Sequence, residues 1–377
     1  MTIGDRRASD AERLHAYVNA LLQADNEEQL LRHLNQLRVE KPFFVRMKVL
    51  YSSMSPAQVF AKLAEAGDLE NISKAAPTYI YTCEAGSRPN RFRIPLAVVR
   101  IPVEGLPENV QVLVSVCTRN EWQCVSRLVR KQYPRLVPIL LSQSEMLQGL
   151  RELGMRTGHA VKVKSYSARE RIGSPETREW KTKREWTDED LEEVIATVQE
   201  RSEVLKSLDV VFYPRSGEAT HIVPSAVCKL RKTGEIEVDG SFEIAFESVA
   251  AVIAEAGLRK LTFFAKRGLR LAGYKPRPMA IQYAQPVFED LENVRNLVAL
   301  LSKYPHSMHA VQHGNPYAHL KLVDMLDHSS FDIWAVPPSK VAILPGMTAS
   351  EAAFERVVDY VFEGFREGDI VDYQYVG

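Results

Sequence analysis

Three apolar segments follow one another before a single helix, and this order decides the fold: TYIYTC (residues 78–83), RFRIPLAVVRIPV (91–103) and NVQVLVSV (109–116). They are rich in β-branched and aromatic residues, as strands are. Residues 119–132 then show apolar positions at helical spacing, directly after the pair Thr118 and Glu121, which matches a capping box. Consecutive strands before a helix favour mixed or antiparallel sheets covered by helices, which is an α+β fold.

The same order returns twice along the chain. Strand patterns at 209–213, 220–231 and 235–240 precede a helical pattern at 243–256, and the stretch LRKLTFFA (258–265) is predicted as a further strand. Three or four short strand patterns between Met308 and Leu344 precede a helix at 349–366. A long helix that starts with acidic residues is predicted at 188–207.

The N-terminal region is predicted to form a helical hairpin that turns at Asp25 and Asn26. Its two apolar stripes are Leu14, Val18, Leu21 and Leu22, then Leu30, Leu31, Leu34 and Leu37. Further capping boxes are predicted at Ser9–Glu12, Ser142–Glu145 and Thr348–Glu351. A short helix is expected to begin at Pro56, since proline suits the first helical position.

These patterns predict a chain of five parts. They are an N-terminal helical region (1–75), a first strand-and-helix unit (76–158), a basic loop or linker (159–187), a second α+β unit (188–285) and a C-terminal hairpin-rich unit that closes with an acidic helix (286–377). A length of 377 residues suffices for two or three domains with a large core.

The composition gives no overall electrostatic preference for a partner. Lys plus Arg and Asp plus Glu each number 48, so any charge bias must be local. The four cysteines form no CxxC pair, which predicts reduced, mostly buried thiols and a cytoplasmic protein. Neither a signal peptide nor an apolar run of membrane-spanning length is seen in the sequence, so no membrane partner is expected.

Local charge segregation is the most informative functional feature. Residues 258–288 and 85–103 contain no acidic residue, whereas the C-terminal region after Pro345 is acidic. The sequence therefore predicts a cationic surface that contacts nucleic-acid phosphates, with Tyr274 as a stacking platform for bases. The candidate residues are Arg88, Arg91, Arg93, Arg259, Lys260, Lys266, Arg267, Arg270, Tyr274, Lys275 and Arg277.

Two other interpretations of the basic residues remain open. Some of them can lie at strand edges and keep those edges soluble. Alternatively, the acidic C-terminal helix docks on the basic segment inside the molecule. No RNA-binding signature or zinc-finger spacing accompanies the charges, so the sequence does not separate DNA from RNA.

The stretch 306–334 holds five of the nine histidines and suggests a second kind of site. Strands are predicted on both sides of a turn at Gly314–Tyr317, which would place His309 and His313 on one face and bring His313 near His319. The alternative interpretation is a divalent metal site, zinc or manganese, formed by His309, His313, His319 and Asp324. No HExxH or HxH spacing supports it, and otherwise no cofactor is expected.

Other catalytic signatures are missing from the sequence. There is no phosphate-binding loop, dinucleotide fingerprint or GxSxG elbow. Glu235, Glu237 and Asp239 alternate along one strand and are predicted to form its solvated face. The leading hypothesis is a non-catalytic cytoplasmic protein that binds DNA or RNA or assembles into a complex. A metal-dependent hydrolase or nuclease and a scaffold subunit that binds only proteins are the alternatives.

Overall fold

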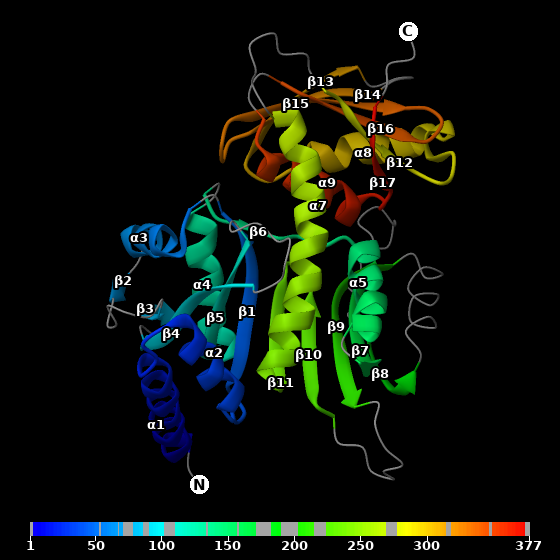
Figure 1. Ribbon diagram of the computed structural model, residues 1–377. Helices are drawn as coiled ribbons and strands as arrows, with labels where there is room; N and C mark the ends of the chain where they lie inside the picture. The colour runs from blue at the N-terminus through cyan, green and yellow to red at the C-terminus, as the bar shows by residue number, and fades with distance from the viewer. Residues whose placement is uncertain are drawn as a thin grey trace. The chain divides into compact units, whose positions relative to one another are not determined.

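The computed structural model divides into two compact units, which are described separately (Figure 1). Unit 1 comprises Met1–Ser167, Lys183–Ala196 and Lys206–Ala256, and unit 2 comprises Ala168–Thr182, Thr197–Leu205 and Gly257–Gly377. The structure describes all residues except 1–2, 53, 67, 71–77, 86–89, 102–109, 133–134, 157, 171–181, 190–202, 215–223, 269–276, 314–317, 347–348 and 374–377.

The frame of unit 1 is an 11-stranded sheet with the order β2-β3-β4-β5-β1-β11-β10-β9-β7-β8, while β6 pairs with β1. The pairs whose register is described are antiparallel, as the α+β prediction requires. The strands are β1 (Phe44–Tyr51), β2 (Asp68–Glu70), β3 (Thr78–Ala85), β4 (Asn90–Arg100), β5 (Val110–Cys117), β6 (Val137–Pro138), β7 (His159–Glu170), β8 (Thr182–Glu189), β9 (Glu203–Pro214), β10 (Ala226–Arg231) and β11 (Glu235–Gly240).

The helices of unit 1 agree closely with the sequence patterns. The predicted hairpin is confirmed, and Asn26 caps its second helix. The helices are α1 (Ile3–Leu22), α2 (Glu27–Gln36), α3 (Pro56–Ala66), α4 (Arg119–Lys131) and α5 (Gln143–Arg156), followed by the π-helix η1 (Ile244–Ala250), which continues into α7 (Ala251–Gly268). The residues of α7 from Gly257 on belong to unit 2. α3 and α4 share a core with the sheet that includes Phe60, Leu113 and Val125.

Two helix starts differ from the predicted capping boxes, while two match them. Thr118 and Glu121 form the full box, and Ser142 exchanges the same two bonds with Glu145. Ser9 lies inside α1, because the helix begins earlier, at Ile3. Ser350 is the cap of the last helix, so the box predicted from Thr348 to Glu351 is wrong.

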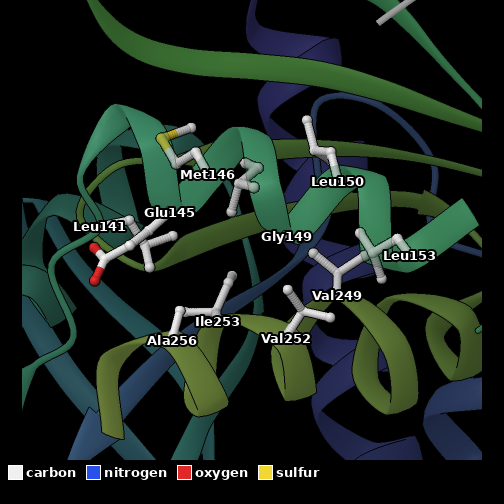
Figure 2. Close-up of a pocket in the computed structure, with 11 residues that line it drawn as sticks. Leu141, Glu145, Met146, Gly149, Leu150, Leu153, Val249, Val252, Ile253 and Ala256 are labelled. Carbon is white, nitrogen blue, oxygen red and sulfur yellow. The ribbon is translucent and has the colours of Figure 1, made fainter. Parts of the chain in front are cut away.

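A small apolar pocket separates α5 from η1 and α7 (Figure 2). Leu150, Leu153, Val252 and Ile253 are among its lining residues, and its volume is about 10 Å³. Gly149 permits the close approach, because a Cβ there would lie 2.6 Å from a methyl group of Val252. A space of this size holds about one water molecule, so it is a packing gap and not a ligand site.

The chain between 182 and 214 corrects the sequence prediction. Residues 182–189 and 203–214 are strands β8 and β9, so the helix predicted at 188–207 is wrong at both ends. β9 pairs with β10 from Ser207 to Phe212, and Leu208, Val210 and Phe212 are buried. The middle of the predicted helix, 190–202, lies outside the described residues. At the described ends, burial against neighbouring strands overrides local propensity.

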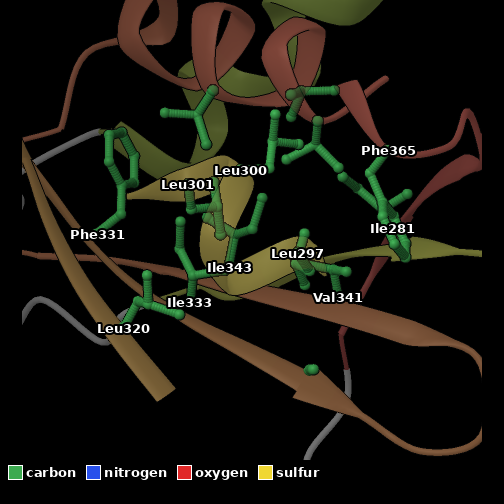
Figure 3. Packing of buried hydrophobic residues seen from close by; sticks show 14 of the residues in the cluster. Ile281, Leu297, Leu300, Leu301, Leu320, Phe331, Ile333, Val341, Ile343 and Phe365 are labelled. Atoms are coloured by element: carbon green, nitrogen blue, oxygen red, sulfur yellow. The ribbon is translucent and has the colours of Figure 1, made fainter. Parts of the chain in front are cut away.

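Unit 2 is a six-stranded sheet with the order β13-β14-β15-β16-β12-β17. Its strands are β12 (Met279–Gln282), β13 (Ser307–His313), β14 (Ala318–Asp324), β15 (Ser329–Val336), β16 (Lys340–Pro345) and β17 (Asp369–Asp372). One face packs on α8 (Leu291–Leu301) and α9 (Glu351–Gly364), and a 3-10 turn, η2 (Val287–Glu289), precedes α8. Figure 3 shows this core, in which Leu297, Phe331 and Ile343 are completely buried.

Residues 258–265, predicted as a strand, belong to helix α7. Thr262, Phe263 and Phe264 are residue types favoured in strands, but the stretch continues a helix that starts at Ala251 without a break. Its apolar residues meet the core of unit 2 at helical spacing: Leu261 and Phe264 are buried, and Phe264 stacks on Phe354 of α9 with ring centroids 5.5 Å apart. Because the segment is a helix and not a strand, its basic residues lie on other faces than the sequence prediction implied.

Candidate functional site

The helical conformation of residues 258–265 sorts the predicted basic residues onto two faces. Lys260 and Arg267 are seven residues apart and therefore lie on the same side of α7, where both are buried. Arg259 and Lys266 have the same spacing one position earlier and are exposed. In a strand, by contrast, Lys260 and Lys266 would share one face and Arg259 and Arg267 the other. The tertiary structure therefore decides which cations meet solvent.

Both buried cations are paired with acids of the C-terminal region. Lys260 Nζ lies 3.5 Å from Glu355 Oε1 in α9. Arg267 donates to Asp372 in β17, and its guanidinium lies 3.4 Å from the ring centroid of Phe263. For Lys260 the partner lies in the acidic C-terminal helix, as the alternative interpretation supposed, whereas Arg267 pairs with an acid of the strand that follows this helix.

The remaining members of the predicted cationic surface are dispersed in the sequence. Arg93 is exposed on β4 and Arg277 is exposed before β12. Arg91 lies opposite Glu84 in the β3–β4 register. Arg88, Arg270, Tyr274 and Lys275 lie outside the described residues.

The predicted hairpin from 307 to 324 is confirmed, and His313 pairs with His319 across it. A β-bulge between Val311 and His313 shifts the register, so the simple alternation that grouped His309 with His313 does not extend to His313. His309 lies opposite Leu322, which faces the core, whereas His319 has the opposite parity on β14. His309 and His319 therefore belong to different faces of the sheet.

His319 has partners that account for its position. Its Nε2 lies 3.1 Å from Asp332 Oδ1, and its ring stacks on Trp334 with centroids 4.6 Å apart. Asp324 is fully buried on the core face, away from His319. Across the described part of the chain, no group of three or more His, Cys, Asp or Glu is arranged to hold a metal ion. His319 does not converge with His309 or Asp324, and the side chain of His313 lies outside the described part of the structure.

A buried polar network surrounds Asp324 at one end of the unit 2 sheet. Asp324 Oδ2 accepts hydrogen bonds from Tyr304 Oη at 3.1 Å and from Arg356 Nε at 3.1 Å, while Oδ1 accepts from the backbone of Leu326. Asp327 accepts from the hydroxyl of Ser350, the cap of α9. The network thus joins the β14–β15 turn to the N-terminal half of α9.

The charges of this network depend on one another. Burial lowers the pKa of Arg356 to about 9. Burial also raises the pKa of Asp324, since both charged forms lose hydration. Pairing offsets this desolvation only while both partners are present. Donors from within the protein occupy both oxygens of the Asp324 carboxylate, so the network is suited to stabilising the fold and not to binding a substrate.

A second set of charges lies on the unit 1 sheet, where Glu235 and Glu237 were predicted to face solvent. Arg46 and Lys48 of β1 are almost completely buried and meet them directly: Arg46 Nη1 lies 2.5 Å from Glu237 and Lys48 Nζ lies 2.8 Å from Glu235. Ser126 of α4 donates to the same Glu235 at 2.9 Å. Only Asp239 is exposed, so the solvated-face prediction is wrong for the two glutamates.

The least protected element of the described structure is β13. Its five central residues, 308–312, are all exposed; Met308 retains 63% of its accessible surface and Val311 retains 47%. The strand pairs on one side with β14, and no other described strand pairs with its second side. β13 is thus the open edge of the sheet, exposed also on both faces.

The hydrogen bonds of the hairpin show which backbone groups β13 directs outward. Met325 N–H donates to His306 C=O at 2.8 Å, in the same register as the β13–β14 ladder. Antiparallel pairs alternate between bonded and non-bonded positions. The backbone groups of Met308 and Ala310 therefore face β14, and those of Ser307, His309 and Val311 face away from the sheet.

β13 differs from the other described sheet edges in its side chains. β2 contains Asp68 and Glu70, β17 contains Asp369 and Asp372, and β8 contains Lys183, Arg184, Glu185, Asp188 and Glu189. β13 reads SMHAVQH and contains no Asp, Glu, Lys, Arg or Pro. Charged residues and proline on edge strands prevent pairing with other chains. β13 lacks both, and its bulge is the only such device within the described strand.

No protein-family model matches the chain, and no curated protein is significantly similar to it. Among the described helices, none combines the length and apolar character needed to cross a membrane. The candidate functional site is therefore defined by its own geometry, and it is the open edge of β13.

Proposed function

We propose that this chain is a non-catalytic assembly protein whose β13 edge receives an extended protein segment. The observation that carries the proposal is the combination of exposed apolar side chains, outward backbone groups and missing charge on a single edge strand. Addition of a strand to an open sheet edge is a common mode of protein recognition, in which backbone hydrogen bonds supply affinity and side chains supply specificity.

The rest of unit 2 supports this role by holding the edge in place. β14, the neighbour of β13, buries Ala318, Leu320 and Leu322 against the core. The Asp324 network then fixes the end of β14 to α9 through Arg356. A strand held on a rigid base pays less conformational entropy on binding than a flexible one.

The proposal is tested by comparing His309→Pro with His309→Ala in protein isolated from its native cells. The N–H of His309 faces away from β14, so proline removes an outward donor without removing a bond of the hairpin. Alanine keeps that N–H and serves as the matched control. The wild type and His309→Ala are expected to elute as an assembly well above 42.6 kDa, and His309→Pro at the mass of the chain.

Two outcomes contradict the proposal. One is a wild-type protein that elutes at the mass of the single chain in the native extract. The other is an assembly that His309→Pro leaves unchanged, because the interface would then lie elsewhere.

The binding of nucleic-acid phosphates, which was predicted from the charge distribution, stays a separate prediction. Of the original candidates, the cations exposed in the described structure are Arg93, Arg259, Lys266 and Arg277. Filter binding of single- and double-stranded DNA and RNA over a salt series tests it, because phosphate contacts make affinity fall as salt rises. Replacement of Arg259, Lys266 and Arg277 by Gln is expected to reduce the salt slope. An affinity independent of salt would exclude phosphate contacts.

A further inference from the structure

We infer that the segment received by β13 is β13 of a second copy of this chain, paired antiparallel about a two-fold axis at His309. This inference rests on the proposed function and names the partner. A closed dimer of this kind uses the same surface on both copies, which is the commonest symmetry of soluble oligomers. The two six-stranded sheets would then join edge to edge.

The register follows from the length of the regular edge. The bulge after Val311 ends the regular ladder, so the available edge runs from Ser307 to Val311. Its outward backbone groups belong to Ser307, His309 and Val311, and His309 is the centre of the three. Antiparallel pairing about that centre places Ser307 opposite Val311 of the second copy and uses every outward group of the regular edge.

The side chains are compatible with this self-pairing. Met308 lies opposite Ala310 of the second copy, so the largest exposed apolar side chain meets a small one across the strands. No Asp, Glu, Lys or Arg occurs between Ser307 and His313, and therefore no pair of formal like charges is brought together when two identical strands meet. An edge with charges of one sign, such as two aspartates, does not satisfy this condition, because the second copy brings the same charges.

The opposite edge strand of the same sheet, β17, has side chains that disfavour pairing with a second copy of itself. In β17 the outward backbone groups belong to Ile370 and Asp372, as the bond from Tyr373 N–H to Pro278 C=O indicates. Asp369 and Asp372 are exposed there. Two copies of β17 would bring four carboxylates together, so β13 is the edge of this sheet that suits a second copy.

The inference is tested first with purified recombinant chain in the absence of other proteins. Sedimentation velocity over a concentration series is expected to show a species of twice 42.6 kDa for wild type and His309→Ala, and a single-chain mass for His309→Pro. In wild type, exchange of the His309 and Val311 amide hydrogens should slow as concentration rises. That measurement decides the matter even if the proline variant fails to fold.

Cysteine crosslinking tests the register. In the proposed dimer His309 faces His309 of the second copy, at a Cα separation typical of a bonded antiparallel pair and within disulfide range. His309→Cys is expected to form a covalent dimer on mild oxidation. Gln312→Cys, equally exposed on the same strand but away from the axis, is the matched control and should stay monomeric.

The outcomes separate this inference from the proposed function. A purified chain that stays monomeric, while the assembly from native cells is still lost in His309→Pro, overturns the second-copy inference and retains the open-edge function. Monomers in both preparations overturn both. A dimer that persists in His309→Pro, or that crosslinks equally through residues 309 and 312, overturns the inferred pairing.

Discussion

The two outer strands of the unit 2 sheet, β13 and β17, are protected to very different degrees. β17 carries Asp369 and Asp372, and Asp372 is bound by Arg267 of α7. β13 carries no charge, exposes Met308 and Val311 and has β14 as its single described strand neighbour. Charged residues therefore protect one edge of this sheet, β17, and are missing from the other, β13. This difference is the basis of the proposal that β13 receives a further strand.

The first prediction transfers the charge pattern of β17 to β13. Asp369 and Asp372 are three residues apart, and so are Met308 and Val311. The variant Met308→Asp/Val311→Asp should weaken self-association by at least about tenfold, about 1.4 kcal/mol, because each copy then brings two carboxylates to the interface and the two copies of residue 308 are diagonal neighbours across the axis. Sedimentation velocity measures the change.

Because both positions are exposed, the free energy of unfolding should change by no more than about 0.5 kcal/mol. Asp369→Met on β17 is the reciprocal control and should not create a second interface while Asp372 remains. Undiminished association of the double variant would show that the lack of charge on β13 has no bearing on assembly.

The second prediction concerns the base on which β13 rests. Asp324→Ala leaves the buried Arg356 without its carboxylate, which should lower the free energy of unfolding by about 3–5 kcal/mol. Urea denaturation monitored by circular dichroism measures it. Asp332→Ala, which removes the half-exposed partner of His319, is the control and should cost less than about 1 kcal/mol. Equal losses would mean that the buried network does not hold β14 in place.

The third prediction concerns the protected edge. Arg267→Met removes a buried guanidinium that packs on Phe263 and binds Asp372, and should destabilise the protein by about 2 kcal/mol. Lys266→Met, at the adjacent exposed position, should change stability by less than about 0.5 kcal/mol. Thermal unfolding of the two variants gives the comparison, and a reversed order would contradict the assignment of buried and exposed faces on α7.

The smallest effect is expected for the acids inside unit 1. Burial of Glu235 by itself raises its pKa, but Lys48 and Ser126 outweigh burial, so the pKa lies below the ordinary value of 4.5. The folded state therefore binds this proton more weakly than the unfolded state. The stabilisation is present above pH 4.5 and is lost as the pH falls toward the lowered pKa. Glu235→Gln should flatten this part of the pH dependence of unfolding, and an unchanged profile would assign it to other groups.

The sequence predicted the local elements better than their partners. The antiparallel α+β class, the helical hairpin, α4 and the hairpins of unit 2 follow from periodicity and turn residues, and all are present. β1 was missed, because its burial depends on the strands that pair with it, β5, β6 and β11. Its sequence FVRMKVLY interrupts an apolar run with Arg46 and Lys48, which are buried only because Glu237 and Glu235 lie opposite them.

The candidate site was predicted in part. The two strands and the nearness of His313 to His319 were predicted from the sequence and are confirmed, whereas the predicted turn at Gly314–Tyr317 lies outside the described residues. The prediction singled out the imidazoles and not the strand that carries them. A run of seven residues without charge or proline, 307–313, was a visible signal. The sequence alone does not show that this run forms an edge strand, and the same run in a central strand would be ordinary.

The amino-acid sequence by itself determined the positions of most helices and hairpins, since apolar periodicity, caps and turn residues act over a few neighbours. It also determined that the C-terminal region is acidic and that 258–288 is basic. Only the tertiary structure decided that Lys260 and Arg267 form ion pairs with Glu355 and Asp372, and that β13 is an edge strand. Ion pairing and strand order join residues tens of positions apart, and no local pattern contains that information.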